Sequence, residues 1–395
     1  MVTAIDRTAM HARVAGAVAY GAQGLCFAAL VTRIPTLQDR FALTDTALAG
    51  LLALVPVVAG LGSVAAGAMI ARVGSAPVLR VVGPIVPLAL VATGLSSSVA
   101  MLIVSLIAVG FGLGSVDATM SAHAVSVESR YGRSLMGSFF AVFSLAGIVG
   151  AGLAALAAGT DLALGAFFAL IAVVVIPVQL VAGPRLLKGR VEIDGTIDDV
   201  SPHHPNREHV RVPWRPIVLI GLALAAVYVA DSAASNWSAV YLNDALGSTE
   251  ALAALAYAFY ALTTLAARLV VDRAVTARGP VLLVRLGGGV AVAAALLVAL
   301  APSPAFGLVA FALLGLGIAP VIPLAFSAAA QHDPLGTGVA VSRVNVFNYV
   351  GFVLGAPLIG IVADMSSLRW AFAALIPVLL LVVVLAPAFA VRTRG

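Results

Sequence analysis

Long apolar segments recur along the whole sequence, with short polar segments between them. Each apolar segment is about 20 residues or longer, which is the length that an α-helix needs to cross a bilayer. Lipid offers no hydrogen-bond partners to exposed backbone groups, and the sequence has no pattern of short alternating strands, so the segments predict membrane-spanning helices. The chain has 395 residues, 62% hydrophobic and 10% charged, with room for about twelve spans plus loops.

We expect six spans in each half of the chain. The expected spans are 12–32, 46–71, 78–96, 99–127, 134–157 and 162–184, followed by 214–242, 250–270, 279–300, 305–328, 337–362 and 369–390. This division predicts an all-α membrane protein with two six-helix bundles related as a pseudo-repeat, residues 1–184 and 214–395, joined by a cytoplasmic linker, 185–213. Pro320 and Pro323 each remove a backbone donor and are expected to kink the tenth span.

The placement of basic residues predicts the orientation. Eighteen of the 22 lysine and arginine residues lie on one side of the membrane if the N-terminus is inside, and only Arg33, Arg40 and Arg369 lie on the other. Cytoplasmic loops are enriched in basic residues, so both termini are expected in the cytoplasm. This placement explains the net charge of +5 without a nucleic-acid partner, because no basic stripe with interleaved aromatic residues is present.

Several residue types limit the chemistry that is open to the chain. The single cysteine, Cys26, excludes an intrachain disulfide. The only lysine, Lys188, is not part of a phosphate-binding Gly-Lys-Ser/Thr motif, so we expect no ATP site and no cofactor; an ion gradient or the gradient of a solute would supply the energy. The central stretch carries His203, His204 and His209 among prolines, and we favour a flexible linker there over a metal site.

Two acidic residues lie well inside expected spans, Asp117 in the fourth and Asp231 in the seventh. An ionised aspartate near the bilayer centre costs about 2.5–3.5 kcal/mol on an insertion scale. Such residues usually face a cavity and bind protons, ions or cargo; a hydrogen bond between helices is the alternative. An acid that alternates between its protonated and ionised forms carries a proton, so both are candidate proton-coupling residues.

Polar and aromatic side chains recur at helical spacing in four of the spans and predict faces turned away from lipid. We interpret each stripe as a solute contact, with helix packing as the alternative. Three roles are open to Arg343: it pairs with a carboxylate, it binds an anionic solute, or its side chain extends to the membrane interface. The candidate solute-binding residues are Tyr20, Gln23, Phe27, Tyr228, Ser235, Tyr257, Tyr260, Arg343, Asn345, Asn348 and Tyr349.

His123 lies near the inner end of the fourth span, on a different helix face from Asp117. We expect an interfacial histidine at this position, with a role as a proton relay as the alternative.

The two halves repeat two features at an offset of about two hundred residues, as transporter folds built from internal repeats do. GAMIARVG (67–74), with Arg72 and Gly74, stands between the second and third spans, and RLVVDR (268–273), with Arg268, Asp272 and Arg273, stands between the eighth and ninth. Glycine-rich segments follow in each half, GFGLG (110–114) and GLG (315–317). We expect the two basic segments to be turns that act as gating loops.

These features together resemble the major facilitator superfamily over essentially the whole sequence. The first basic turn departs from the family signature at Ala71, where an aspartate is usual, whereas the second keeps Asp272. More narrowly, DATMSAH (117–123) and DSAASNWSAVYL (231–242) are similar to a bacterial branch related to the fucose–proton symporters. Those symporters use an acid on helix four, where Asp117 falls, and another on helix one, where this chain has Gln23.

The resemblance and the intramembrane acids predict a secondary active transporter that moves a small polar organic solute by alternating access with proton coupling. We expect it to act as a monomer in the bacterial inner membrane. Efflux of drugs or metabolites by proton antiport is one alternative, and an intramembrane enzyme is an alternative of another class. An enzyme needs a convergent catalytic cluster, but Asp117 and His123 point to different helix faces.

Overall fold

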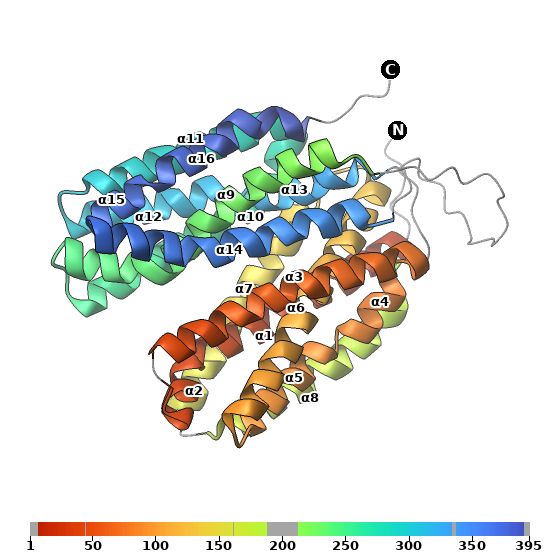
Figure 1. The fold of residues 1–395 in the computed structure, drawn as a ribbon. Helices are drawn as coiled ribbons and strands as arrows, with labels where there is room; N and C mark the ends of the chain where they lie inside the picture. The colour runs from red at the N-terminus through yellow and green to blue at the C-terminus, as the bar shows by residue number, and fades with distance from the viewer. Residues whose placement is uncertain (1–6, 44, 161, 188–211, 334–336, 391–395) are drawn as a thin grey trace. The chain divides into compact units, whose positions relative to one another are not determined.

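The computed structural model describes residues 7–43, 45–160, 162–187, 212–333 and 337–390, and every element assigned in these ranges is a helix (Figure 1). Twelve of these helices are long and apolar enough to cross a membrane, which confirms the predicted fold class. They run over Arg7–Thr32, Ala53–Val73, Ser75–Leu95, Val99–Tyr131, Met136–Ala154, Leu164–Arg185, Trp214–Ala245, Leu255–Arg278, Pro280–Leu300, Pro304–Ala330, Val339–Met365 and Leu368–Phe389. Each overlaps one expected span.

In the first half of the chain, one short helix, α2, lies between the first and second spans, and the hydropathy pattern did not predict it. The elements are α1 (Arg7–Thr32), α2 (Ile34–Phe41), α3 (Asp45–Val73), α4 (Ser75–Val82), α5 (Ile85–Leu95), α6 (Val99–Tyr131), α7 (Met136–Gly159), α8 (Leu164–Ala182) and the 3-10 turn η1 (Gly183–Arg185).

The last six spans follow the same order, with a π-helical turn after the first of them. The elements are α9 (Trp214–Val240), η2 (Tyr241–Ala245), α10 (Glu250–Arg278), α11 (Pro280–Leu300), α12 (Pro304–Ile318), α13 (Val321–Ala330), α14 (Val339–Met365), α15 (Leu368–Ala373), α16 (Leu375–Leu385) and the 3-10 turn η3 (Ala386–Phe389). The tenth span is interrupted between α12 and α13 at Pro320, as expected of a residue without a backbone N–H.

The eighth span is longer than expected, and the prediction that residues 268–273 form a turn is wrong. Helix α10 continues to Arg278 and ends at Gly279, whose φ of 76° lies in the left-handed region. Arg268, Asp272 and Arg273 are therefore helical, because the helix accommodates charges that the hydropathy pattern places outside the membrane. Arg72 likewise lies in the last turn of α3, which leaves Gly74, with φ of 83°, as the turn residue.

The chain forms two compact units, and each unit includes a short segment from the other half of the sequence. Unit 1 comprises Met1–Leu135, Val142–Val212 and Asp333–Asn345; unit 2 comprises Met136–Ala141, Pro213–His332 and Val346–Gly395. Helix α7 thus begins in unit 2 and continues in unit 1, and α14 does the reverse. Most of the expected linker, residues 188–211, lies outside the described residues.

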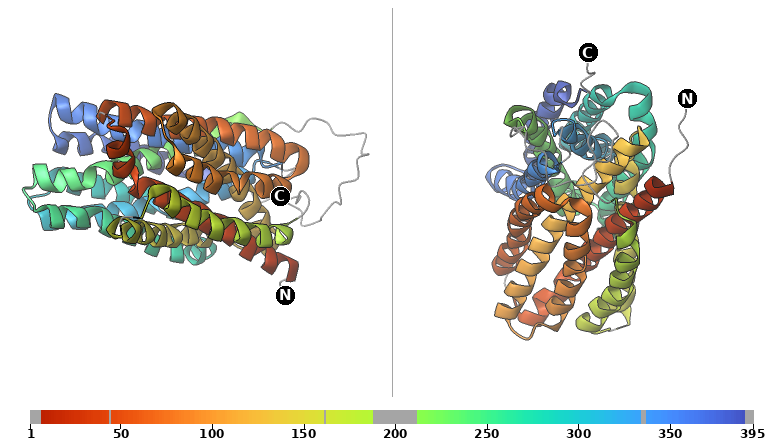
Figure 2. Two further views of the ribbon diagram at one scale, coloured as in Figure 1. Left: turned by 90° about the horizontal axis from the view of Figure 1, so that it is seen from below. Right: turned by 90° about the vertical axis from the view of Figure 1, so that its right-hand side faces the viewer.

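In unit 1, α6 packs against α1, α3, α4 and α5, and α5 also packs against α8 (Figures 1 and 2). The approach of α3 to α6 depends on glycine. A Cβ added at Gly110 would lie 2.6 Å from the carbonyl oxygen of Val55, and one at Gly62 would collide with the backbone of Phe111. Small residues at such positions let membrane helices pack backbone against backbone.

Unit 2 repeats this arrangement with the corresponding helices. Helix α12 packs against α10 and α11, and a Cβ added at Gly317 of α12 would lie 2.6 Å from the backbone nitrogen of Ala291. Both glycine-rich segments noted in the sequence therefore mark close helix crossings, which supports their reading as parts of an internal repeat. Tyr241, Phe311 and Phe372 add an aromatic cluster, with ring centroids 5.1 to 6.1 Å apart.

Substitution of Gly62 tests the close approach of α3 and α6. Gly62→Val should destabilise the purified protein by about 1–3 kcal/mol, because the new side chain overpacks the crossing. Gly60, on the same helix, has nothing within 4 Å of an added Cβ and provides the matched control, Gly60→Val. Thermal unfolding in detergent should show a lower Tm for Gly62→Val alone. Equal losses in the two variants would attribute the cost to valine in a helix and not to the crossing.

Candidate functional site

In unit 1, Asp117 of α6 is half-buried and bound by a side chain from α1. The Gln23 Nε2 group donates to Asp117 Oδ1 at 2.9 Å and to the carbonyl oxygen of Leu113 at 3.2 Å. Gln23 itself is only 4% exposed. The one amide group therefore fixes the carboxyl group at a set position beside α1, and both residues predicted for this site are brought together.

The other two residues of the predicted α1 stripe behave differently from each other. The Tyr20 hydroxyl, one turn before Gln23, lies 3.3 Å from Ser121 Oγ of α6 and is fully buried. Phe27 is 36% exposed, and its ring packs at 6.5 Å from that of Phe143 on α7. The structure thus joins Tyr20 and Gln23 to the helix of Asp117, whereas Phe27 lies outside this group.

The expectation of an interfacial His123 is wrong. The side chain is fully buried, with Nε2 3.3 Å from the carbonyl oxygen of Ala12 on α1. Within the described part of the chain its Nδ1 has no hydrogen-bond partner. The imidazole is a third polar group between α1 and α6, and its burial comes from the packing of these two helices, which the hydropathy pattern does not encode.

In unit 2, Asp231 of α9 accepts a hydrogen bond from the Tyr260 hydroxyl of α10. The Tyr260 ring is buried and stacks on the Tyr257 ring, with centroids 5.9 Å apart and planes 27° apart. Arg268, further along α10, is near enough for its charge to act on Asp231, and its guanidinium lies 5.5 Å from the centroid of the Phe140 ring. Asp231 and Tyr260 were both predicted, whereas the nearby positive charge was assigned to a turn.

Exposed polar side chains continue from this acid along α9 and α10. Tyr257 is 47% exposed and is hydrogen-bonded to Ser235, which is exposed together with Asn236. Tyr228, one turn before Asp231, is half-buried. Hydroxyl and amide groups exposed within spanning helices suit water or a polar solute and not lipid tails.

The predicted residues on α14 divide between the two units. Asn345 is buried in unit 1, where its Nδ2 donates to Ser63 Oγ of α3 at 3.1 Å and Ser342 Oγ donates to the Ser63 carbonyl oxygen at 2.6 Å. Asn348 and Tyr349 belong to unit 2. Ser63, a lone hydroxyl in an apolar span, was not predicted, and the structure joins Asn345 to it in a helix-packing contact.

Arg343 reaches the backbone at the start of the second half of the chain. Its Nη1 donates to the carbonyl oxygen of Val212 at 3.1 Å, and the side chain is half-buried. This contact with backbone differs from the three roles expected for Arg343, which stay predictions.

Two carboxylates lie at the helix starts where the chain passes from one unit to the other. Asp272 accepts from the backbone N–H groups of Gly137 and Ser138, at 2.8 and 2.7 Å, which belong to the first residues of α7. Asp333, 3% exposed, accepts from the backbone N–H of Thr337 at 3.1 Å, just before α14. N–H groups at a helix start lack partners within the helix, and Asp272 supplies acceptors for those of α7. Asp333 instead holds Thr337, whose Oγ1 accepts from the backbone N–H of Val339 at the start of α14, at 3.4 Å.

The remaining predicted residues take no part in these contacts. Arg273 and Arg72 are exposed, and Gly74 is buried between α3 and α4. His203, His204 and His209, which raised the question of a metal site, lie outside the described residues.

Comparison with known proteins places this geometry in a family. The sequence matches the family profile described as Major Facilitator Superfamily over residues 16–338. It is 30% identical over 377 residues to an uncharacterised MFS-type transporter of Yersinia pestis, which covers 95% of this chain and 94% of the relative.

Solved structures of low sequence identity share the fold. The structure of FucP, the fucose:proton symporter of E. coli, in its outward conformation matches with a TM-score of 0.77 and 14% identity, over 98% of this chain and 100% of that chain. The human organic anion transporter MFSD10 matches with a TM-score of 0.77 and 16% identity, over 96% and 99%. These proteins are transporters and not enzymes. The chain therefore belongs to the major facilitator superfamily and is a multi-pass membrane transporter.

Proposed function

We propose that this transporter moves a small polar organic solute by alternating access and couples that movement to protons through Asp117 and Asp231. One observation carries the proposal: each unit holds a half-buried acid inside a spanning helix, bound by a polar side chain of a neighbouring helix. An acid in that position is costly unless it has partners or reaches water. Its protonation state can then change during the transport cycle.

The partner of Asp117 supports this role. Gln23 donates an N–H to the carboxylate, and an amide does not itself take up a proton at physiological pH. A proton that arrives at this pair therefore resides on Asp117. The competing reading is a hydrogen bond that only holds α1 to α6, and asparagine separates the two readings because it keeps the shape and the acceptor but cannot be protonated there.

The exposed groups of α9 and α10 support a polar solute. Tyr257 offers a partly open ring face, and Ser235 and Asn236 offer hydroxyl and amide groups beside it. A ring of this kind stacks on an apolar face of a solute while the polar groups bind its hydroxyls. A panel of sugars, including fucose, with organic acids and nucleosides, screened by thermal shift on the purified protein, would identify the solute class.

Asp117→Asn should abolish uptake driven by a proton gradient, because the variant carries no exchangeable proton at this position. Exchange of labelled for unlabelled solute should persist, since solute binding and the helix contact with Gln23 remain. Both are measured in proteoliposomes with the solute found in the screen. Asp364→Asn, at the exposed end of α14, is the matched control. Gradient-driven uptake that survives in Asp117→Asn would refute the carrier role.

Asp231→Asn should weaken solute binding or alter its pH dependence across roughly pH 5 to 8, because a titrating acid is lost next to the exposed groups of α9 and α10. Tyr260→Phe removes only the donor and should lower affinity less than about tenfold, since one net hydrogen bond is lost. Binding is measured by isothermal titration in detergent. A binding curve of Asp231→Asn that matches the parent at every pH would exclude Asp231 from the site.

We further propose that Asp272 acts as a gating residue through the start of α7. Alternating access requires helix ends to separate and rejoin, and the two hydrogen bonds to Gly137 and Ser138 hold one such end. Met136, next to them, is fully buried and serves as a reporter once it is replaced by cysteine.

Asp272→Asn should expose the start of α7 more often, because the helix start loses a charged partner and one of two acceptors, and a hydrogen bond to a charged group contributes about 1.5–3 kcal/mol. In a Cys26→Ala background, Met136→Cys should react several-fold faster with a membrane-impermeant maleimide when Asp272→Asn is added. Asp364→Asn provides the control for a lost carboxylate. An unaltered labelling rate would mean that Asp272 does not hold this helix end.

Export by proton antiport is the second candidate, and the exposed Phe27 in the first span favours it, because amphiphilic cargo needs aromatic contact. Uptake into inside-out vesicles energised by a proton gradient would indicate export. We also infer that the protein acts as a monomer in the bacterial inner membrane. The bacterial relative supports the location, which membrane fractionation tests. Light scattering of the purified protein tests the monomeric state.

A further inference from the structure

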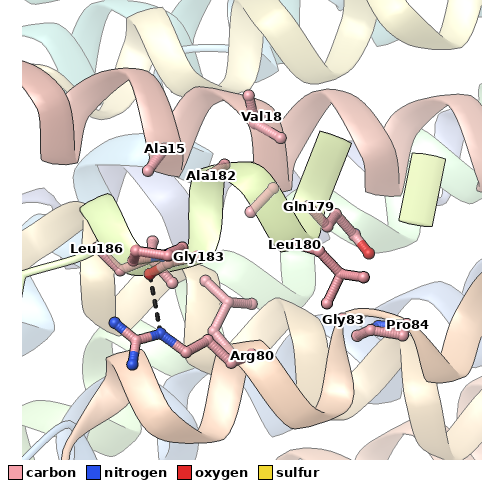
Figure 3. A pocket seen from close by; sticks show the side chains of 13 residues that line it. Ala15, Val18, Arg80, Gly83, Pro84, Gln179, Leu180, Ala182, Gly183 and Leu186 are labelled. Atoms are coloured by element: carbon pink, nitrogen blue, oxygen red, sulfur yellow. Dashed lines mark hydrogen bonds between the residues drawn. The ribbon is translucent and has the colours of Figure 1, made fainter. Parts of the chain in front are cut away.

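A pocket of about 250 Å³ lies in unit 1, enclosed by α1, the end of α4 and the end of α8 with η1 (Figure 3). Small residues line much of its wall: Ala15 and Ala19 on α1, and Gly83 and Gly183 at the helix ends. None of the acids or candidate solute-binding residues lines it. The pocket is therefore separate from the proposed transport site.

Arg80 provides the positive charge of this pocket. Its Nε donates to the carbonyl oxygen of Gly183 at 2.8 Å, which orients the guanidinium at the pocket wall, as Figure 3 shows. The side chain is exposed, and among the described residues its terminal nitrogens have no protein acceptor. No lining residue is acidic. A planar guanidinium with two available nitrogens is suited to the oxygens of a phosphate group.

Gln179 of α8 offers the complementary group. Its Oε1 is shielded from solvent and has no hydrogen-bond partner among the described residues. A buried acceptor without a donor costs free energy, so a ligand that brings an O–H or N–H group would restore what the protein lacks. The space for such a group depends on Gly83, because a Cβ added there would lie 3.3 Å from Gln179 Oε1.

Exposed apolar side chains of spanning helices lie beside the pocket: Leu180 lines it, and Val181 and Val81 are the chain neighbours of Leu180 and Arg80. Leu180 and Val181 on α8 and Val81 on α4 are each exposed by more than half. Arg80 lies five residues into α4, roughly 7.5 Å along the helix from its start, a depth that suits a lipid headgroup above acyl chains. The positive charge of Arg80 thus lies beside exposed apolar side chains, as a lipid headgroup lies beside its acyl chains.

We propose that this pocket binds the headgroup of an anionic glycerophospholipid that carries free hydroxyls, of the phosphatidylglycerol type. The phosphate oxygens accept hydrogen bonds from the terminal nitrogens of Arg80, a headgroup hydroxyl donates to Gln179 Oε1, and the acyl chains lie along Leu180 and Val181. A purely structural Arg80, which only binds the end of α8, would show no preference among lipids.

Native mass spectrometry of the purified full-length protein tests the proposal with phosphatidylglycerol and phosphatidylcholine added in equal amounts. The parent should retain phosphatidylglycerol preferentially. Arg80→Gln should lower that preference by about tenfold, because a charge-assisted hydrogen bond is lost, and Arg80→Lys should restore part of it. Arg278→Gln, which removes an equally exposed cation at the end of α10, should leave the preference unchanged.

Gln179→Leu provides the second measurement. This variant should lose preference for phosphatidylglycerol over phosphatidic acid, which has the phosphate without the glycerol hydroxyls. Inorganic phosphate and glycerol 3-phosphate, added in excess, should not displace the lipid if the acyl chains contribute; displacement would assign the pocket to a free phosphate compound and overturn the lipid proposal. Equal lipid preference in the parent, Arg80→Gln and Arg278→Gln would overturn it as well.

Discussion

The exclusion of water from the membrane is the constraint on which the rest of this structure depends. A polar group inside a span that neither water nor a ligand reaches needs a partner from the chain itself, and arginine often provides one at a helix end. Arg40 donates to the carbonyl oxygen of Gly94 at 2.7 Å and Arg369 to that of Ala301 at 2.9 Å. Carbonyls at helix C-termini lack partners and carry partial negative charge, so a guanidinium satisfies both needs. Arg40 and Arg369, which the sequence analysis uses only to predict orientation, thus also bind the ends of neighbouring helices.

The spans were predictable from the sequence because apolar length is a direct consequence of bilayer thickness. The position of a charge inside a span was not. The pattern places Arg268 and Asp272 in a turn, since both residues are costly in lipid, whereas the structure gives Asp272 the amides of α7 and places Arg268 over Phe140. Hydropathy counts the cost of a charge but not the partner that offsets it, and that partner lies more than a hundred residues away in sequence.

The same limit explains which site residues were found. Gln23 and Asp117 were each visible as a polar residue in an apolar span, and the structure adds their hydrogen bond. The partner of Asn345 was not visible, because Ser63 is a small hydroxyl of the kind that spans tolerate anywhere. Burial of His123 was missed for a related reason, since its side chain lies between two helices whose pairing no local pattern encodes.

The internal repeat gives the arrangement of the two acids a physical explanation. Tyr20, Gln23 and Phe27 on the first span recur at one constant offset as Tyr228, Asp231 and Ser235 on the seventh. Repeat-related positions lie at equivalent depths in transporters built from internal repeats. The fucose–proton symporters that the sequence resembles use acids on helices one and four. This chain keeps the acid on helix four and has its second acid at the repeat counterpart of the helix-one position.

The exchange alters the role of the first span. With Gln23 in place of an acid, that span provides an amide donor that binds Asp117, and one carboxyl group falls in each unit instead of two in unit 1. The hydrogen-bond donor beside each carboxyl group helps to set its protonation. In the proposed proton coupling, the protonation of each acid therefore depends on its own local partner, Gln23 for Asp117 and Tyr260 for Asp231.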